Sequence, residues 1–291
     1  MVQADETPVM VSKDGRPANS RSYMWVYRTG KIYTDTPIIL YEYQRTRKAD
    51  HPREFLKDFS GGGCDGYSAY RKLDRENPDI IFVGCWTHAR RYFSDALKAL
   101  PKGVQKTAKD TVAYEALKRI GVIYYLDYQL SDLEPDDRKK QRQITVKPLV
   151  AVFFAWTKEV QSSGRLSKGK TLEGINYCIN QEEALKVFLN DGEVPLDNNV
   201  TEGALRSFCL HKHAWKLIDN SIDGAKSSAI IYSITETAKA NNLNPFRYLA
   251  HVLTVLKDHQ NDTEYSFIEE LLPWSDQSPE TCRSKSKTTN V

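Results

Sequence analysis

Two neighbouring stretches, SYMWVYR at residues 22–28 and PIILYEY at residues 37–43, decide the fold class of this chain. Both are rich in β-branched and aromatic side chains, which favour extended backbone in a sheet. Residues 2–11 have a similar composition and predict an earlier strand. Pro8 interrupts that strand or marks it as an edge, because proline has no N–H to donate to a neighbouring strand. The first part of the chain therefore predicts a sheet.

Helical and extended patterns alternate after these strands. Residues 52–59 predict a short helix that ends at a run of three glycines, and a second helix follows Cys64–Tyr67. The apolar run IIFVGC at residues 80–85 predicts a buried strand, and a further helix begins near Trp86. This mixed order indicates one sheet covered by helices, which is an α/β fold.

The middle of the chain predicts helices only. Apolar residues recur at helical spacing between Thr111 and Leu130, and further helices are expected from Pro135, over residues 148–161 and over residues 182–190. Two more helices are expected later, at residues 224–241 and 245–256. The polar tail after Trp274 predicts disorder.

The overall composition limits the class of protein. The chain has 291 residues, 40% of them hydrophobic, and a net charge of +3, which permits nucleic-acid binding without requiring it. Its five cysteines are scattered and form no CxxC pair, which is typical of a reduced, cytoplasmic protein without a cysteine zinc site. No apolar run approaches the ~20 residues of a membrane span, and the N-terminus has no signal-peptide pattern. Three tryptophans in apolar surroundings are assigned to core packing: Trp25, Trp86 and Trp156.

Three carboxylates stand in local patterns that suit a two-metal site. Asp5 lies in the first predicted strand, Asp65 follows the glycine run, and Glu202 stands at the start of a predicted helix. Two-metal phosphoryl transfer needs a few carboxylates that converge on two cations about 3.5–4 Å apart. Magnesium prefers oxygen ligands and keeps several waters, so three carboxylates suffice.

Each of these acids also has a simpler interpretation. Asp5 fits an exposed charge near the end of the chain, and Asp65–Gly66 is a common turn dipeptide. Asn199 and Glu202 have the spacing of a helix capping box. With 38 acidic residues in the chain, spacing alone does not select this triplet.

Six sequence blocks, in this order, carry a resemblance to a known family: ADET, CDGYSAY, GCWTHARRYF, LDNNVTEGALR, YSITETAKANNLNPFRYLAHVL and EELLPW. Together they resemble the insertion-sequence-66 family of bacterial transposases over residues 2–274. The resemblance implies a DDE transposase with a ribonuclease H-like core, a mixed sheet flanked by helices, and an all-helical insertion before the last catalytic residue. It implies metal-dependent cleavage of transposon ends followed by strand transfer.

The resemblance assigns residues to roles by motif. Asp5, Asp65 and Glu202 match the family's catalytic acids, which would hold two Mg²⁺ or Mn²⁺ ions. The implied organisation is a first part of the core, a helical insertion, a second part of the core and a C-terminal element with a disordered tail, at residues 1–91, 92–195, 196–256 and 257–291. The expected partners are transposon-end and target DNA, a second copy of the chain in the DNA complex, and other element-encoded proteins, with no membrane.

Two basic groups are candidate DNA contacts. The predicted helix after Trp86 carries His88, Arg90 and Arg91, of which His88 and Arg91 share a face. The segment after Glu202 supplies the second group: Arg206, His211, Lys212, Trp215 and Lys216. Lysine and arginine neutralise phosphates, and an indole can stack on a displaced base. A solvated helical face remains the alternative for the first group, and an intrahelical ion pair with Glu202 the alternative for Arg206.

Two departures from the family pattern bear on activity. Family members usually carry an N-terminal region with a coiled coil, a zinc-binding motif and a DNA-binding domain, whereas this chain begins almost at the first catalytic strand. A truncated gene product is therefore expected. Gly203 stands where the family typically has arginine, which removes a phosphate contact and weakens the helix. A catalytically inactive remnant that at most binds DNA, and a ribonuclease H-like nuclease or resolvase, are the alternative functions.

Overall fold

The structure is a computed structural model, and it describes residues 2–17, 20–29, 36–58, 83–105, 108–166, 168–214 and 219–284. The chain divides into two compact units, one formed by Pro52–Asn199 and the other by Val2–His51 together with Val200–Val291. They are called here the helical unit and the sheet unit. The short helix α1 (Asp50–Phe55) spans the first boundary between them, close to the helix predicted at residues 52–59.

Over the described residues, the sheet unit contains a three-stranded antiparallel sheet in the order β1-β3-β4. The strands are β1 (Val2–Val9), β3 (Ser22–Thr29) and β4 (Ile39–Gln44), which confirms the three strands predicted in this part of the chain. Pro8 lies within β1, which is an edge strand among the strands described. A second, two-stranded sheet pairs β2 (Val11–Lys13) in parallel with β5 (Asp219–Ser221).

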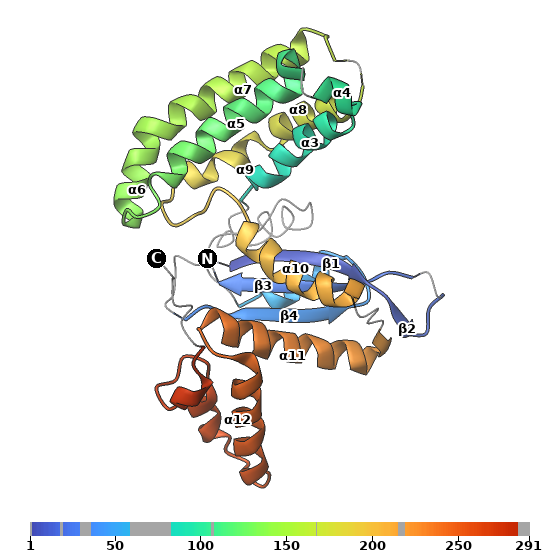
Figure 1. Cartoon of the computed structure of the whole chain (residues 1–291), viewed down its shortest axis with the longest axis vertical. Coiled ribbons are helices and arrows are strands. Elements are labelled where there is room, and N and C mark those ends of the chain that lie inside the picture. Colours follow the sequence, from blue (N-terminus) through green and yellow to red (C-terminus); the bar gives the residue numbers. More distant parts are fainter. Residues whose placement is uncertain are drawn as a thin grey trace. The chain divides into compact units, whose positions relative to one another are not determined.

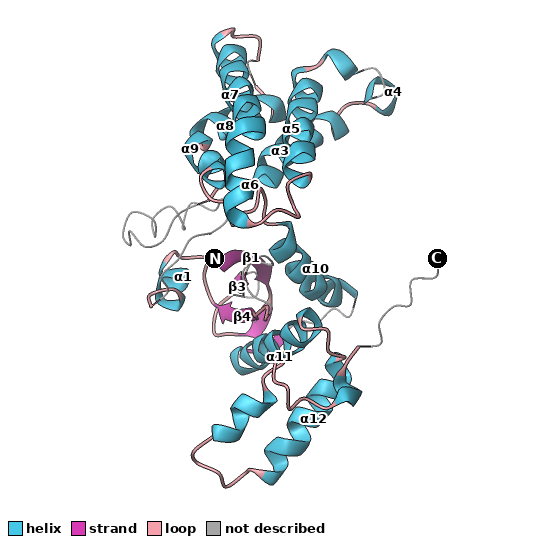
Figure 2. Ribbon diagram, turned by 90° about the vertical axis from the view of Figure 1, so that its left-hand side faces the viewer, coloured by secondary structure: helices cyan, strands magenta, loops and turns pink. Residues whose placement is uncertain are grey.

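Helix α10 (Asn199–Ala214) packs against one face of the sheet, and α11 (Ile222–Ala240) runs beside β4, as Figures 1 and 2 show. Side chains alternate between the faces of a strand, so Met24 and Val26 point to this side, whereas Trp25 and Tyr27 point to the other. Leu205 and Phe208 of α10 join the same apolar cluster, together with Ala225 and Ala229 of α11. This shared core holds both helices to the sheet.

The outer edge of β4 is covered by hydroxyl groups of α11. The N–H of Ile39 donates to Oγ1 of Thr237 at 3.0 Å, and that hydroxyl donates to the carbonyl of Ile39 at 2.9 Å. The N–H of Tyr41 donates to Oγ of Ser233 at 2.8 Å. These contacts satisfy backbone groups that an open sheet edge would leave for pairing with another chain.

After α1, the helical unit contains seven α-helices among its described residues. They are α3 (Trp86–Lys98), α4 (Lys102–Gln105), α5 (Val112–Tyr128), α6 (Pro135–Gln141), α7 (Lys147–Ser162), α8 (Lys170–Asn180) and α9 (Glu182–Lys186). The helices predicted in this region are confirmed. Helix α3 crosses residue 91, where the sequence placed a domain boundary. The core gathers around Trp86, whose ring lies 5.4 Å from that of Phe153 and 6.3 Å from that of Phe188.

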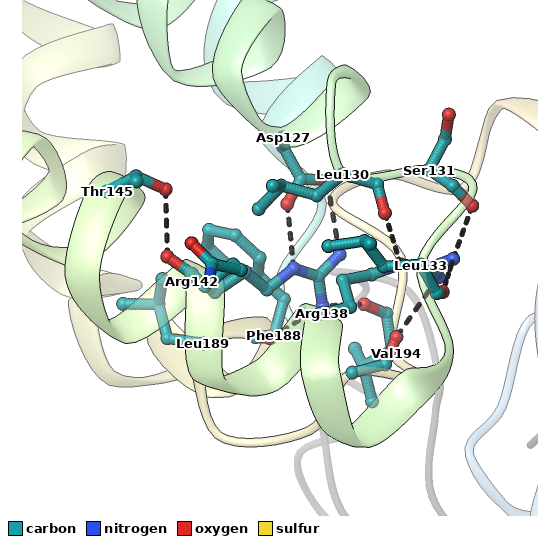
Figure 3. Close-up of polar contacts among 12 residues, drawn as sticks. Asp127, Leu130, Ser131, Leu133, Arg138, Arg142, Thr145, Phe188, Leu189 and Val194 are labelled. Carbon is teal, nitrogen blue, oxygen red and sulfur yellow. Dashed lines mark hydrogen bonds and ion pairs between the residues drawn. The ribbon is translucent and has the colours of Figure 1, made fainter.

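Two buried arginines fix the irregular segments of this unit (Figure 3). Arg142 opens a short π-helical turn, Arg142–Val146, and its Nε and Nη2 donate to both carboxylate oxygens of Asp127 at 2.7 and 3.1 Å. Its Nη1 donates to three backbone carbonyls, those of Phe188, Asp191 and Val194. Arg138 donates to the carbonyls of Leu130, Ser131, Leu133 and Gly192. Loop carbonyls thus gain charged donors, which at Leu130 and Asp191 add to a backbone N–H from a nearby residue.

The prediction of a strand at residues 80–85 is wrong for the residues that the structure describes. Residues 83–85 are described and none of them lies in a strand, whereas residues 80–82 lie outside the described part. The N–H of Gly84 donates to the carbonyl of Ala184 at 2.9 Å, so this backbone bonds to a helix. A Cβ at Gly84 would lie 2.9 Å from the backbone N of Leu185, so the approach needs glycine.

The C-terminal part of the sheet unit forms a small cluster of its own. Helix α12 (Pro245–Asp258) is followed by two 3₁₀ turns, Ser266–Leu271 and Glu280–Cys282. The prediction of disorder after Trp274 is wrong as far as Ser284, because Cys282 is buried and its carbonyl accepts from the N–H of Asn244 at 2.7 Å. Residues 285–291 lie outside the described part. Over the described residues, no helix combines the length and the apolar character that a membrane span needs.

Candidate active site

Strand β1 presents Asp5 to the face of the sheet on which α10 lies. Gln3 and Thr7, two residues to either side, both contact α10, and alternate residues of a strand share a face. The Asp5 side chain is half-buried, and its Oδ1 accepts from the N–H of Glu6 at 2.8 Å. Asp5 is therefore no frayed terminal charge, since it stands in a paired strand opposite Val26.

The neighbouring acid, Glu6, faces the other way. Its side chain is only 3% exposed and forms an ion pair with Arg47, whose Nε donates to Oε1 of Glu6 at 2.6 Å. Glu6 is paired with Trp25 in the sheet register, on the face opposite to α10. Of the two adjacent carboxylates, Asp5 is therefore the one that lies on the α10 side.

Polar contacts join the described side chains of α10 to the sheet. The hydroxyl of Thr201 donates to Oε1 of Gln3 at 3.3 Å, and Oγ1 of Thr7 lies 3.4 Å from Sγ of Cys209. The hydroxyl of Tyr41, on β4, donates to the carbonyl of Ala204 at 2.9 Å. Burial, followed by the nearby Glu236 carboxylate, raises the pKa of Tyr41 far above its usual value, so this phenol stays a donor.

Glu202 lies in the first turns of α10, directly after Thr201. Its backbone is therefore next to the contact with Gln3 on β1, two residues from Asp5. The side chain of Glu202 and all of Asp65 lie outside what the structure describes. Of the three predicted metal ligands, Asp5 is thus the one whose side-chain surroundings the structure describes. Among the described residues, no group of three histidine, cysteine or acidic side chains is close enough to hold a metal ion.

The segment that leads into α10 is held by residues that the sequence did not single out for this role. The carboxylate of Asp197 accepts from the N–H of Asn199 at 3.0 Å, and Oδ1 of Asn199 accepts from the hydroxyl of Thr87 at 3.0 Å. Thr87 also lies 3.1 Å from the hydroxyl of Tyr124. Burial, and then the charge of Asp197, raise the pKa of Tyr124. Helix α10 begins at Asn199, whose predicted capping side chain bonds to Thr87 and Asp197.

The predicted DNA-contacting residues fall into both units. On α3 of the helical unit, Arg90 and Arg91 are exposed and His88 is half-buried. In the sheet unit Arg206 is exposed on α10. The other four predicted contacts are not described as side chains: those of His211 and Lys212, which belong to α10, and all of Trp215 and Lys216.

Comparison with known proteins identifies the family. A family model described as the transposase IS66 family matches residues 1–227, and one described as the IS66 C-terminal element matches residues 233–274. The chain belongs to the IS66 transposase family. The resemblance seen in the six sequence blocks is thus confirmed, and the second match covers α12 and the LLPW segment.

Curated relatives of this IS66 family member carry no assigned function. It is 31% identical to the uncharacterized protein y4qI of Sinorhizobium fredii (strain NBRC 101917 / NGR234) over 286 residues, which are 94% of this chain and 50% of the relative. It is 31% identical to the uncharacterized protein y4hP of the same organism over 255 residues, 83% of this chain and 44% of the relative. The chain spans about half the length of these relatives. No solved structure matches it.

Gly203, where the sequence resemblance led us to expect arginine, stands at an open position of α10. It is exposed, and a Cβ built there would meet nothing within 4 Å. Gly203→Ala is therefore expected to stabilise the protein by about 1 kcal/mol, the difference in helix propensity between the two residues. Urea unfolding followed by circular dichroism measures the change.

Gly164 provides the matched control, because it is equally open but has a φ of +65°. Gly164→Ala is expected to lower stability, since alanine is strained in the left-handed region. Equal effects of the two substitutions would contradict the helical assignment of Gly203.

Proposed function

We propose that this chain is the catalytic part of a DNA transposase that cleaves transposon ends and joins them to target DNA by metal-dependent phosphoryl transfer. Membership of the IS66 transposase family supports DNA as the substrate. The observation that carries the assignment of chemistry is the contact of β1 with α10, which brings the strand of Asp5 against the helix of Glu202. Asp65 is the third proposed acid.

In this proposal the three carboxylates Asp5, Asp65 and Glu202 hold two Mg²⁺ or Mn²⁺ ions. Asp5 suits this role because it is half-buried and lies on the α10 side of the sheet. When bound, two such ions activate an attacking oxygen and stabilise the leaving one. The sheet unit then supplies a ribonuclease H-like core, and the helices of the helical unit form the insertion between Asp65 and Glu202.

The proposed DNA contacts add positive charge on two elements. Arg90 and Arg91 are exposed on α3 and Arg206 is exposed on α10, so each can reach a phosphate oxygen. His88, His211, Lys212, Trp215 and Lys216 complete the proposed set. A second copy of the chain and other element-encoded proteins are proposed partners in the DNA complex.

The test is a substrate panel with the purified chain. Labelled duplexes ending in the element's terminal sequence, RNA–DNA hybrids and four-way junctions are each incubated with Mg²⁺, Mn²⁺ or EDTA, and products are separated by size. Cleavage and joining of transposon ends only with a divalent cation would support the proposal. Preference for junctions would support a resolvase, and absence of cleavage with end-specific binding would support the inactive remnant.

A further inference from the structure

Two hydrogen bonds hold α10 to the sheet on either side of the position of Glu202. On one side the Thr201 hydroxyl donates to Gln3 of β1, and on the other the Tyr41 hydroxyl of β4 donates to the carbonyl of Ala204. These four residues are called here the α10 clamp. The clamp lies entirely within the sheet unit, and its two bonds reach the two outer strands of the three-stranded sheet.

The members of the clamp are buried more deeply than polar groups usually are. Thr201 is 0% exposed, and Gln3 and Tyr41 are each 6% exposed. The Tyr41 ring is fixed by aromatic neighbours, with ring centroids 6.2 Å from Phe208 and 5.5 Å from Tyr232. A buried hydroxyl costs free energy unless it is hydrogen-bonded, so these groups strongly favour one arrangement of the helix.

The apolar contacts of α10 attach it to the sheet. Ala204, Leu205 and Phe208 join the cluster that packs on the sheet, and attraction between apolar groups is not directional. The clamp adds direction, because Thr201 and Ala204 lie about 60° apart around the helix axis. One bond to β1 and one to β4 together oppose both rolling and sliding of the first turns of α10.

We propose that the α10 clamp is a positioning device that holds the backbone of Glu202 at a fixed place relative to Asp5. This inference rests on the proposed function, in which both acids bind the same pair of cations. Gln3, Thr201 and Tyr41 are positioning residues and touch neither metal nor DNA. A displacement of about 1 Å in a catalytic group can lower a rate by about 100-fold, so two hydrogen bonds of ordinary strength have a large effect on turnover.

The experiment removes each hydroxyl without changing the packing. Thr201→Val and Tyr41→Phe abolish one bond each, and Thr201→Ser keeps the hydroxyl. Tyr43→Phe is the matched control, since Tyr43 is also 6% exposed, belongs to the same apolar cluster, and bonds at 3.0 Å to Ser22 rather than to α10. For each variant, kcat and KM for end cleavage and the Mn²⁺ concentration for half-maximal rate are measured.

Thr201→Val and Tyr41→Phe are each expected to lower kcat by about 10- to 100-fold and to raise the Mn²⁺ requirement, with KM for DNA nearly unchanged. Thr201→Ser should restore most of the rate, and Tyr43→Phe should behave like the wild type apart from thermal stability. Amides in the first turns of α10 should exchange hydrogen faster in Thr201→Val and Tyr41→Phe only.

The outcomes separate this inference from the function on which it rests. If Asp5→Asn is inactive while Thr201→Val and Tyr41→Phe match the Tyr43→Phe control, the clamp is overturned and the proposed function stands. If cleavage persists fully in Asp5→Asn, the proposed function is overturned, and the role of the clamp falls with it. Loss of kcat without any change in the Mn²⁺ requirement would also overturn the positioning role.

Discussion

Asp5→Asn is expected to lower the rate of metal-dependent cleavage of transposon ends by about 1000-fold. The substitution keeps the size of the side chain and its place opposite Val26 in the sheet, but removes the negative charge. Metal ions contribute several kcal/mol of charge stabilisation in such reactions, and a loss of about 4 kcal/mol corresponds to about 1000-fold in rate. Single-turnover cleavage of labelled end DNA with Mg²⁺ and with Mn²⁺ measures the effect.

Glu6→Gln is the matched control for this prediction. Glu6 is the adjacent acid of the same strand, yet it lies on the other face of the sheet, where it pairs with Arg47. The Glu6→Gln variant is expected to keep most of the cleavage rate. Its folded state should be somewhat less stable, because the ion pair with Arg47 is lost. If Glu6→Gln loses as much activity as Asp5→Asn, or if Asp5→Asn stays fully active, the assignment of Asp5 is contradicted.

Much of the sheet could be predicted because its strands are rich in β-branched and aromatic side chains, a composition typical of strands. SYMWVYR and PIILYEY became β3 and β4, since alternating large side chains can bury both faces of the sheet. The helices of the middle region followed from their apolar rhythm, and Thr111 caps α5 by accepting from the N–H of Tyr114. These features are local, so a single sequence contains the information for them.

The candidate site was predictable only in part, because its geometry depends on long-range pairing. Alternation implies that Asp5 and Glu6 face opposite ways, but not which of them faces α10. That choice follows from the contacts of Gln3 with Thr201 and of Thr7 with Cys209, about 200 residues away in sequence. The predicted metal site itself stays a prediction.

Two other predictions were wrong because they depended on backbone hydrogen bonds, which sequence patterns do not reveal. The run at residues 80–85 is apolar enough for a strand, yet Gly84 bonds to the end of a helix instead. The polar composition after Trp274 suggested disorder, but a small buried Cys282 and backbone bonds to Asn242 and Asn244 order the chain there. In both cases the acceptor or donor is a main-chain group, which every residue carries.

The buried Arg142 shows how strongly such main-chain contacts can hold a fold. Its side chain is 2% exposed and serves one carboxylate and three carbonyls, in segments from α5 to the loop before α10 (Figure 3). Arg142→Met keeps the apolar stem but removes all these donors. Asp127, whose side chain is 13% exposed, would then be left without its partner in a poorly hydrated place.

Arg142→Met is therefore expected to destabilise the helical unit by about 3–5 kcal/mol, the usual cost of removing one partner of a buried ion pair. Arg142→Lys should recover only part of this loss, because an ammonium group cannot reach a carboxylate and three carbonyls at once. Urea unfolding followed by circular dichroism measures both variants, with Arg165→Met, an exposed arginine of the same unit, expected to change stability by less than about 0.5 kcal/mol. A cost for Arg142→Met as small as that of Arg165→Met would mean that water replaces the guanidinium, and that residues 188–194 are held by their other contacts, among them the bonds of Gln143 to Leu189 and of Arg138 to Gly192.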